Sequence, residues 1–144
     1  MILVEFASKF RRVAAEETRV LHVVDHETIP PGEYGFLEFF CPDPACDCRR
    51  VTLRVTTPDG RPWAFISYGW EKRAFYRRWA HSKDADDMAG LSLDTLNDQS
   101  NLAEYFLGFF RHMVRTDRKY VERLKRHYRM FKVLSGEDPE RDGT

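Results

Sequence analysis

The residues best suited to chemistry lie in one short stretch, because all three cysteines of the chain fall within eight residues. They are Cys41, Cys46 and Cys48, in a C-x4-C-x-C pattern. Three thiolates that converge on one point repel one another unless a cation lies among them, and thiolates are good ligands for Zn²⁺. An odd cysteine count also argues against a disulfide framework. The pattern therefore predicts a metal knuckle over residues 41–48, with the three cysteines as ligands of a zinc ion.

The spacing inside this stretch fits a metal site better than a disulfide. Cys46 and Cys48 are two residues apart, so an extended backbone places both side chains on the same side. A disulfide between cysteines this close would be strained, and Pro42 and Pro44 stiffen the loop after Cys41. Two other interpretations stay open: three free thiols without a metal, and an iron–sulfur cluster, although clusters are usually held by four cysteines.

Zinc takes four ligands in a tetrahedron, so three sulfurs leave one position for another group. His127 is the expected fourth ligand, because it borders the apolar stripe of a predicted C-terminal helix that must pack on the sheet. His81, Asp47 or a water molecule are the alternatives. His22 lies in mid-strand, and His26 lies more than ~20 Å from the thiols at ~3.3 Å per strand residue.

Strand-like sequence flanks the cysteine stretch on both sides. Residues 50–56 alternate apolar and polar side chains, which is typical of a half-buried strand. Prolines and a glycine at 30–32, and the sequence Thr57-Pro58-Asp59-Gly60, are turn signals between such segments. The chain therefore predicts a four-stranded antiparallel meander, with the cysteine stretch as its middle connection. The four predicted strands are residues 18–25, 34–40, 50–56 and 61–68.

Helical spacing of apolar residues dominates the second half of the chain. It predicts helices over residues 70–80, 102–115 and 117–134, with an acidic, irregular segment between the first two. Residues 1–17 are ambiguous between helix and loop. Strands followed by helices indicate the α+β class, with a four-stranded antiparallel meander and about three helices packed on it. We expect one domain over residues 1–136 and a charged C-terminal tail over 137–144.

Composition narrows the class of protein further. The chain has 144 residues, 42% of them hydrophobic, and 23 basic side chains balance 23 acidic ones. This length suffices for one domain with its own core. No apolar run approaches the ~20 residues that span a bilayer, and the first residues lack the layout of a signal peptide. We therefore expect no membrane contact, a cytoplasmic location and reduced thiols.

The charges are unevenly distributed along the chain. Residues 111–132 contain nine Lys/Arg against two acids, and residues 84–110 contain six acids and no Lys/Arg. A basic helix of this kind is one feature of nucleic-acid-binding proteins. Two plainer explanations are that the acidic segment lies across the basic helices, or that these side chains form a solvated face. Nucleic-acid binding by residues 111–132 is therefore kept as an alternative function.

Sequence motifs for catalysis are absent. There is no glycine-rich phosphate loop, no Gly-x-Ser-x-Gly and no His-Glu-x-x-His. A zinc ion with an open position can activate water, but three thiolates make it a poorer Lewis acid. The sequence thus favours a zinc-binding adaptor or interaction module with an unidentified protein partner. A zinc-dependent hydrolase is the second alternative.

Residues 34–51 carry a family resemblance, together with the later pair His127-Tyr128. The run Tyr34-x-Phe-x-Glu-x-x-Cys41-x-x-Pro44-x-Cys46-Asp47-Cys48 resembles an uncharacterised bacterial domain family with a Cys-x4-Cys-x-Cys hairpin. Such hairpins are sometimes found near SEC-C-type zinc motifs. The resemblance covers less than half of the chain and implies metal binding, with no established activity. The paired C-terminal cysteines of the SEC-C pattern are absent here.

Overall fold

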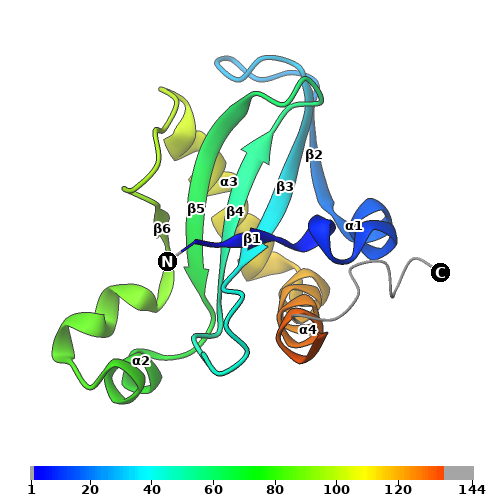
Figure 1. Ribbon diagram of the computed structural model, residues 1–144. Coiled ribbons are helices and arrows are strands. Elements are labelled where there is room, and N and C mark those ends of the chain that lie inside the picture. Colours follow the sequence, from blue (N-terminus) through cyan, green and yellow to red (C-terminus); the bar gives the residue numbers. More distant parts are fainter. Residues whose placement is uncertain (1, 135–144) are drawn as a thin grey trace.

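The fold is built on one antiparallel sheet, which Figure 1 shows in a computed structural model. The structure describes residues 2–134, and the predicted tail at 137–144 lies outside them. Strands β2 to β6 form a meander, and β1 joins the edge that β2 also occupies by pairing with the end of β3. The six strands are β1 (Val4–Glu5), β2 (Arg19–Val23), β3 (Gly32–Phe40), β4 (Arg50–Thr56), β5 (Pro62–Gly69) and β6 (Gly90–Leu93).

The register follows from the alternation in the sequence. Val51, Leu53 and Val55 of β4 are all buried, whereas Thr52 and Arg54 between them lie on the opposite face and stay partly exposed. Successive strand residues point to opposite faces, so one face of the sheet becomes apolar and must be covered.

Helices cover that apolar face. Figure 1 shows α3 behind the sheet and α4 at its lower end, while the chain leading into β1 crosses in front. Buried aromatic side chains from both layers form the core. The ring centroids of Phe36 and Phe110 are 6.1 Å apart in a stacked pair, and those of Phe40 and Phe131 are 5.6 Å apart in a tilted pair. The helices are α1 (Arg11–Glu17), α2 (Arg73–Ala80), α3 (Ala103–Thr116) and α4 (Arg118–Leu134), with 3₁₀ turns η1 (Phe6–Ser8) and η2 (Lys83–Met88).

The α+β class is confirmed, and the four predicted strands are β2, β3, β4 and β5 of the sheet. The structure adds β1 and β6 at its margins and α1 in the segment that the sequence left ambiguous. Both added strands are short, so their local pattern is too brief to indicate a strand, and their pairing depends on β3 and β5. No helix within residues 2–134 is long and apolar enough to cross a membrane.

Candidate metal centre

The cysteines lie in the connection between β3 and β4, at the lower end of the sheet in Figure 1. Cys41 and Cys48 are buried and Cys46 is half-buried. All three line one hollow of about 180 Å³. The other lining residues come from the ends of β3 and β4 and from the segments beside them: Leu3, Phe39, Arg50, Val51, Thr52, Trp79 and Met88. The fold therefore brings the three predicted sulfur ligands to one small, mostly apolar space.

The thiols influence one another within this space. Burial, together with charge repulsion and hydrogen bonding from the neighbouring Cys48 and Cys41, raises the pKa of Cys46 to about 12. Arg50 also lines the hollow, where burial lowers the pKa of its guanidinium, and it donates to the carbonyl of Met88. Without a cation the Cys46 sulfur is thus held as a thiol. A divalent metal would reverse this preference by stabilising the thiolate.

The contacts among the thiols run pairwise through Cys46. Residues 2–134 contain no group of three His, Cys, Asp or Glu side chains that is already placed to hold a metal ion. Ligation by all three thiols would therefore require the side chains to turn toward a common centre. Side-chain rotation is cheap compared with backbone movement, because staggered rotamers interconvert without disturbing the fold.

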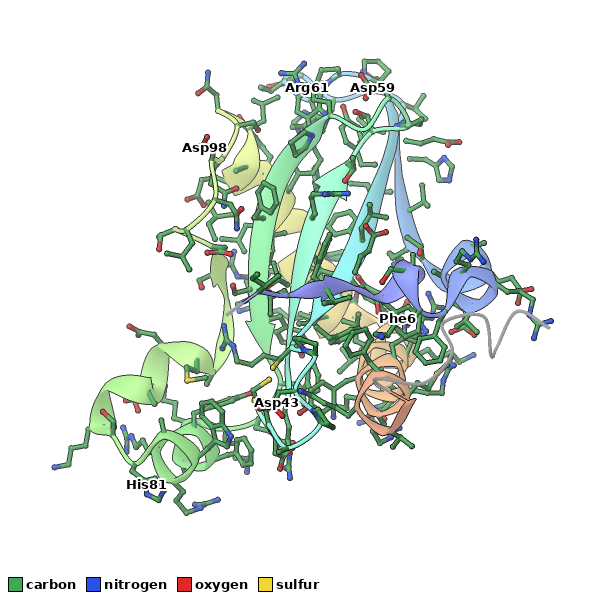
Figure 2. All side chains as sticks on the ribbon, in the orientation of Figure 1. Phe6, Asp43, Asp59, Arg61, His81 and Asp98 are labelled. Atoms are coloured by element: carbon green, nitrogen blue, oxygen red, sulfur yellow. The ribbon has the colours of Figure 1, made fainter. Side chains whose placement is uncertain are left out.

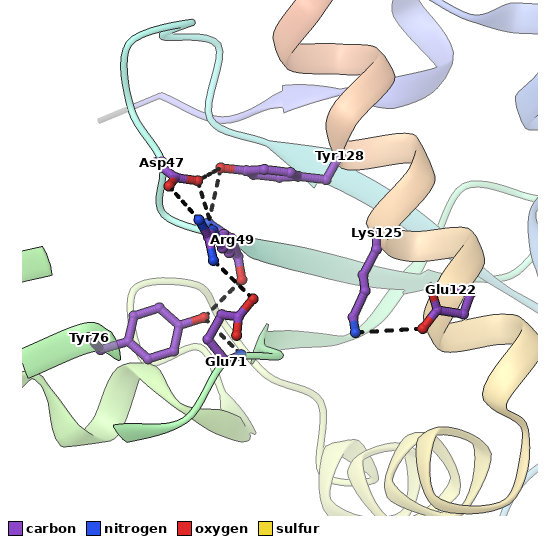
Figure 3. Close-up of polar contacts among 7 residues, drawn as sticks. All are labelled: Asp47, Arg49, Glu71, Tyr76, Glu122, Lys125 and Tyr128. Carbon is purple, nitrogen blue, oxygen red and sulfur yellow. Dashed lines mark hydrogen bonds and ion pairs between the residues drawn. The ribbon is translucent and has the colours of Figure 1, made fainter. Parts of the chain in front are cut away.

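The backbone of Arg49 holds the end of the loop in an unusual conformation. Its φ is +49°, in the left-handed region that costs a non-glycine residue roughly 1–2 kcal/mol. Its N–H donates to the Tyr128 hydroxyl at 3.0 Å, and its carbonyl accepts from the Tyr76 hydroxyl at 2.8 Å. Figure 3 shows that these two tyrosines reach Arg49 from different helices. They belong to α4 and α2, so both helices fix the backbone that follows Cys48.

Side chains reinforce the same loop. The Arg49 guanidinium donates to both carboxylate oxygens of Asp47 at 3.0 and 2.9 Å and to Glu71 at 3.2 Å, as Figure 3 shows. On the other side of the loop, Lys132 donates to the carbonyls of Cys41 at 2.9 Å and Asp43 at 2.8 Å. These bonds to charged groups are each stronger than neutral ones. The segment that carries the thiols is consequently fixed at both of its ends.

Replacing Tyr128 by phenylalanine is expected to lower the free energy of unfolding by about 1–2 kcal/mol, because a partly buried N–H loses its acceptor. Chemical denaturation of both proteins measures the difference. Tyr105→Phe is the matched control: its hydroxyl is exposed and lies 3.4 Å from Thr28, so we expect a change within about 0.5 kcal/mol. Equal losses in the two variants would contradict the anchoring role of Tyr128.

The structure does not bring His127 to the thiols. Its imidazole is 1% exposed, with Nδ1 at 2.6 Å from Glu38 and Nε2 at 2.7 Å from Glu17. The ring also stacks on Phe6 at 4.3 Å. Both nitrogens are therefore engaged by carboxylates, and ligation of a metal would first require one of these bonds to break. His127 does lie at the border of the apolar stripe of α4, as predicted, but its neighbours there are the carboxylates of Glu17 and Glu38.

The two carboxylates around His127 differ in environment. Burial raises the pKa of Glu38, although the hydrogen bond from His127 opposes it. Burial also opposes ionisation of Glu17, but its bonds to His127 and Arg126 outweigh this and lower its pKa. Neither residue was singled out as part of a site from the sequence. Glu38 did carry a signal, as an acid on the inward side of a predicted strand.

The other candidate ligands are also occupied or distant. Asp47 binds Arg49, and His81 ends α2 as an exposed residue in the left-handed region, at the outer end of that helix in Figure 2. His26 accepts hydrogen bonds from the N–H groups of Thr28 and Ile29 in the loop before β3. Within the described residues, the hollow itself offers only the thioether of Met88 besides the thiols as a metal-binding side chain.

The acidic segment does not neutralise the basic helices in the part of the chain that is described. Asp86 pairs with Arg77 of α2, and Asp94 accepts hydrogen bonds from its own loop. Among the side chains that the structure describes, no ion pair joins residues 85–110 to residues 111–132. Of the two plainer explanations for the charge pattern, the one in which the acidic segment covers the basic helices is therefore not supported.

Comparison with protein-family models, with curated proteins and with solved structures finds no match. The resemblance to a bacterial cysteine-hairpin family thus stays a prediction, supported only by residues 34–51 and by the pair at 127–128. Function has to be argued from the geometry of this chain.

Proposed function

We propose that the chain is a zinc-binding interaction module, with Cys41, Cys46 and Cys48 as the protein ligands. The observation that carries this proposal is the meeting of all three cysteines in one hollow, with Cys46 against both of the others. Cysteines that act only as free thiols do not have to line the same hollow. In a chain of 144 residues, cysteines that served only as small apolar side chains would have no reason to lie together.

The surroundings of the thiols support the same ligand set. Three thiolates and one Zn²⁺ carry a net charge of −1, and the buried cation of Arg50 beside them offsets that charge. Soft sulfur ligands favour zinc over magnesium or calcium. A water molecule is the simplest fourth ligand, because His127 is held by Glu17 and Glu38. Bound zinc would fix the end of the β3–β4 connection and add to the stability of the fold.

A structural role accounts for this placement better than a catalytic one. The loop is tied to α4 by Tyr128 and Lys132, and to α2 by Tyr76, so a metal there would join the sheet to two helices. The hollow is small and mostly apolar, which leaves little room for a polar substrate beside the metal. We place the module in the reducing cytoplasm, where thiols stay available to metal.

The direct test is metal analysis of protein purified without chelators. We expect about one zinc ion per chain, and a loss of at least about 90% of it in Cys46→Ser. Cobalt(II) exchanged into the site is expected to give thiolate-to-metal charge-transfer absorption, which weakens in each single cysteine-to-serine variant. The intensity of this absorption reports the number of sulfur ligands, and the spectrum reports the coordination geometry, without any assay of activity.

His127→Gln is the matched variant for the fourth ligand. Glutamine can still hydrogen-bond the neighbouring carboxylates, so we expect this variant to keep its zinc and its cobalt spectrum. Protein that binds neither zinc nor cobalt while all three thiols react with a thiol reagent would overturn the proposal. If the purified protein instead contains iron and acid-labile sulfide, the three cysteines hold an iron–sulfur cluster and not a zinc ion.

A further inference from the structure

A large hollow on the described surface lies along α4 and is basic. It measures about 680 Å³ and is lined by five cations and two acids. Both acids are already paired: Glu17 with Arg126 and His127, and Glu122 with Lys125. The net charge that this hollow presents to solvent is therefore strongly positive. Its five cations are Arg118, Lys119, Arg123, Arg126 and Arg129, and we call this surface the α4 basic face.

Within the α4 basic face, two cations form hydrogen bonds with Glu17, and three have no acidic partner among the described residues. Arg123 donates to the carbonyl of Glu17 at 3.0 Å, and Arg126 donates to its carboxylate at 2.7 Å. The remaining three, Arg118, Lys119 and Arg129, are exposed, and no acid among residues 2–134 pairs with them. Uncompensated cations beside a hollow are the arrangement that binds phosphate backbones, because each cation that neutralises a phosphate releases a counterion condensed on the nucleic acid.

A second hollow adjoins the first and contains aromatic side chains. It measures about 340 Å³, and Arg129 lines both hollows. Trp70 and Tyr128 line the second one, with their rings edge to face at 5.2 Å. The acids in it, Asp47 and Glu71, are both bound by Arg49 as Figure 3 shows, so they do not repel an anion strongly. This second hollow is called the Trp70 pocket.

We propose that the α4 basic face and the Trp70 pocket together bind single-stranded nucleic acid. The phosphates follow the cations of α4, and a base enters the Trp70 pocket, where an indole stacks with any base. From Arg118 to Arg129 the helix rises about 17 Å, enough for several phosphates. A flexible strand can bend from one hollow into the next, whereas a duplex is a stiff rod and an acidic peptide has no base to stack. The inference uses no metal, although the Trp70 pocket shares Asp47, Arg49 and Tyr128 with the cysteine loop and its anchors.

The test is fluorescence anisotropy of a labelled 12-nucleotide single strand with the whole protein. With about three phosphates neutralised, log K falls with log salt with a slope near −2, so a change from 50 to 200 mM NaCl weakens binding ~20-fold. Arg118→Gln with Arg129→Gln is expected to bring that slope to about −0.7. Trp70→Leu is expected to weaken binding about tenfold while the slope stays unchanged. Circular dichroism confirms that each variant is folded.

The matched control removes two exposed arginines elsewhere, with Arg73→Gln and Arg78→Gln on α2. Total charge changes equally, so this variant should bind like the unaltered protein. If the control variant loses as much affinity as the α4 variant, the loss depends on net charge alone and the proposal is overturned. So would equal or tighter binding of a 12-base-pair duplex or of a polyglutamate peptide, and so would no binding at 50 mM NaCl.

Discussion

His127→Leu lowers the free energy of unfolding by about 3–5 kcal/mol, which is the expected cost of leaving a buried carboxyl without its hydrogen-bonded partner. The Glu38 side chain is 3% exposed and loses the imidazole that lies 2.6 Å from it. Burial already raises the pKa of this carboxyl, so without a partner it has neither solvent nor a cation. Leucine preserves the apolar contact with Phe6, and the loss therefore reports on the polar pair. Urea denaturation measures it.

The double variant Glu38→Met with His127→Leu separates the effect of the lost polar contact from the effect of changed packing. Removing both members leaves no buried charge, so we expect most of the lost stability to return. Glu17 remains, but it is 30% exposed and keeps Arg126 as a partner. His112→Leu, at an exposed position on α3, is the control and should stay within about 0.5 kcal/mol. A double variant no more stable than the single one would refute this account of the cluster.

The second large effect is expected at Gly69, the last residue of β5. A Cβ there would overlap the backbone carbonyl oxygen of Met88 and lie 2.6 Å from the Tyr76 hydroxyl. A backbone oxygen cannot rotate away as a side chain can, so η2 must move from the sheet. We expect Gly69→Ala to cost about 2–3 kcal/mol, as overpacking does. Because Tyr76 also holds Arg49 and Met88 lines the thiol hollow, zinc content should fall as well.

Gly108→Ala is the matched control, because a Cβ at this position in α3 meets nothing within 4 Å. Alanine is the better helix former, so this variant should gain about 0.5–1 kcal/mol. Thermal unfolding of the two variants side by side should therefore shift in opposite directions. A stable Gly69→Ala protein with unchanged metal content would show that the η2 segment is not fixed against β5.

The central strands could be predicted because their signal is local. Val51, Leu53 and Val55 alternate with polar residues, and alternation alone indicates which side is buried. In contrast, β1 is two residues long and exists only through its partners Phe39 and Phe40. No property of Val4 or Glu5 by itself indicates that pairing.

The site was predictable in part for a similar reason. The three cysteines lie within eight residues, so their positions in the sequence already place them in one loop. The setting of His127 depends on Glu38 and Glu17, which are 89 and 110 residues away. Periodicity placed His127 at the border of an inward stripe and Glu38 in step with Tyr34 and Phe36, but only the packing of α4 on β3 and α1 decides that they meet. A buried histidine and a buried acid on facing elements are better read as partners of each other.

The dependence of the cysteine loop on α4 has a consequence during protein synthesis. The thiols leave the ribosome long before Tyr128 and Lys132, which hold the loop's backbone through Arg49, Cys41 and Asp43. At ~5–20 residues per second, some 80 residues are added in that interval, or roughly 4–16 s. A nascent chain therefore carries three sulfurs for seconds before α4 can fix the loop that bears them.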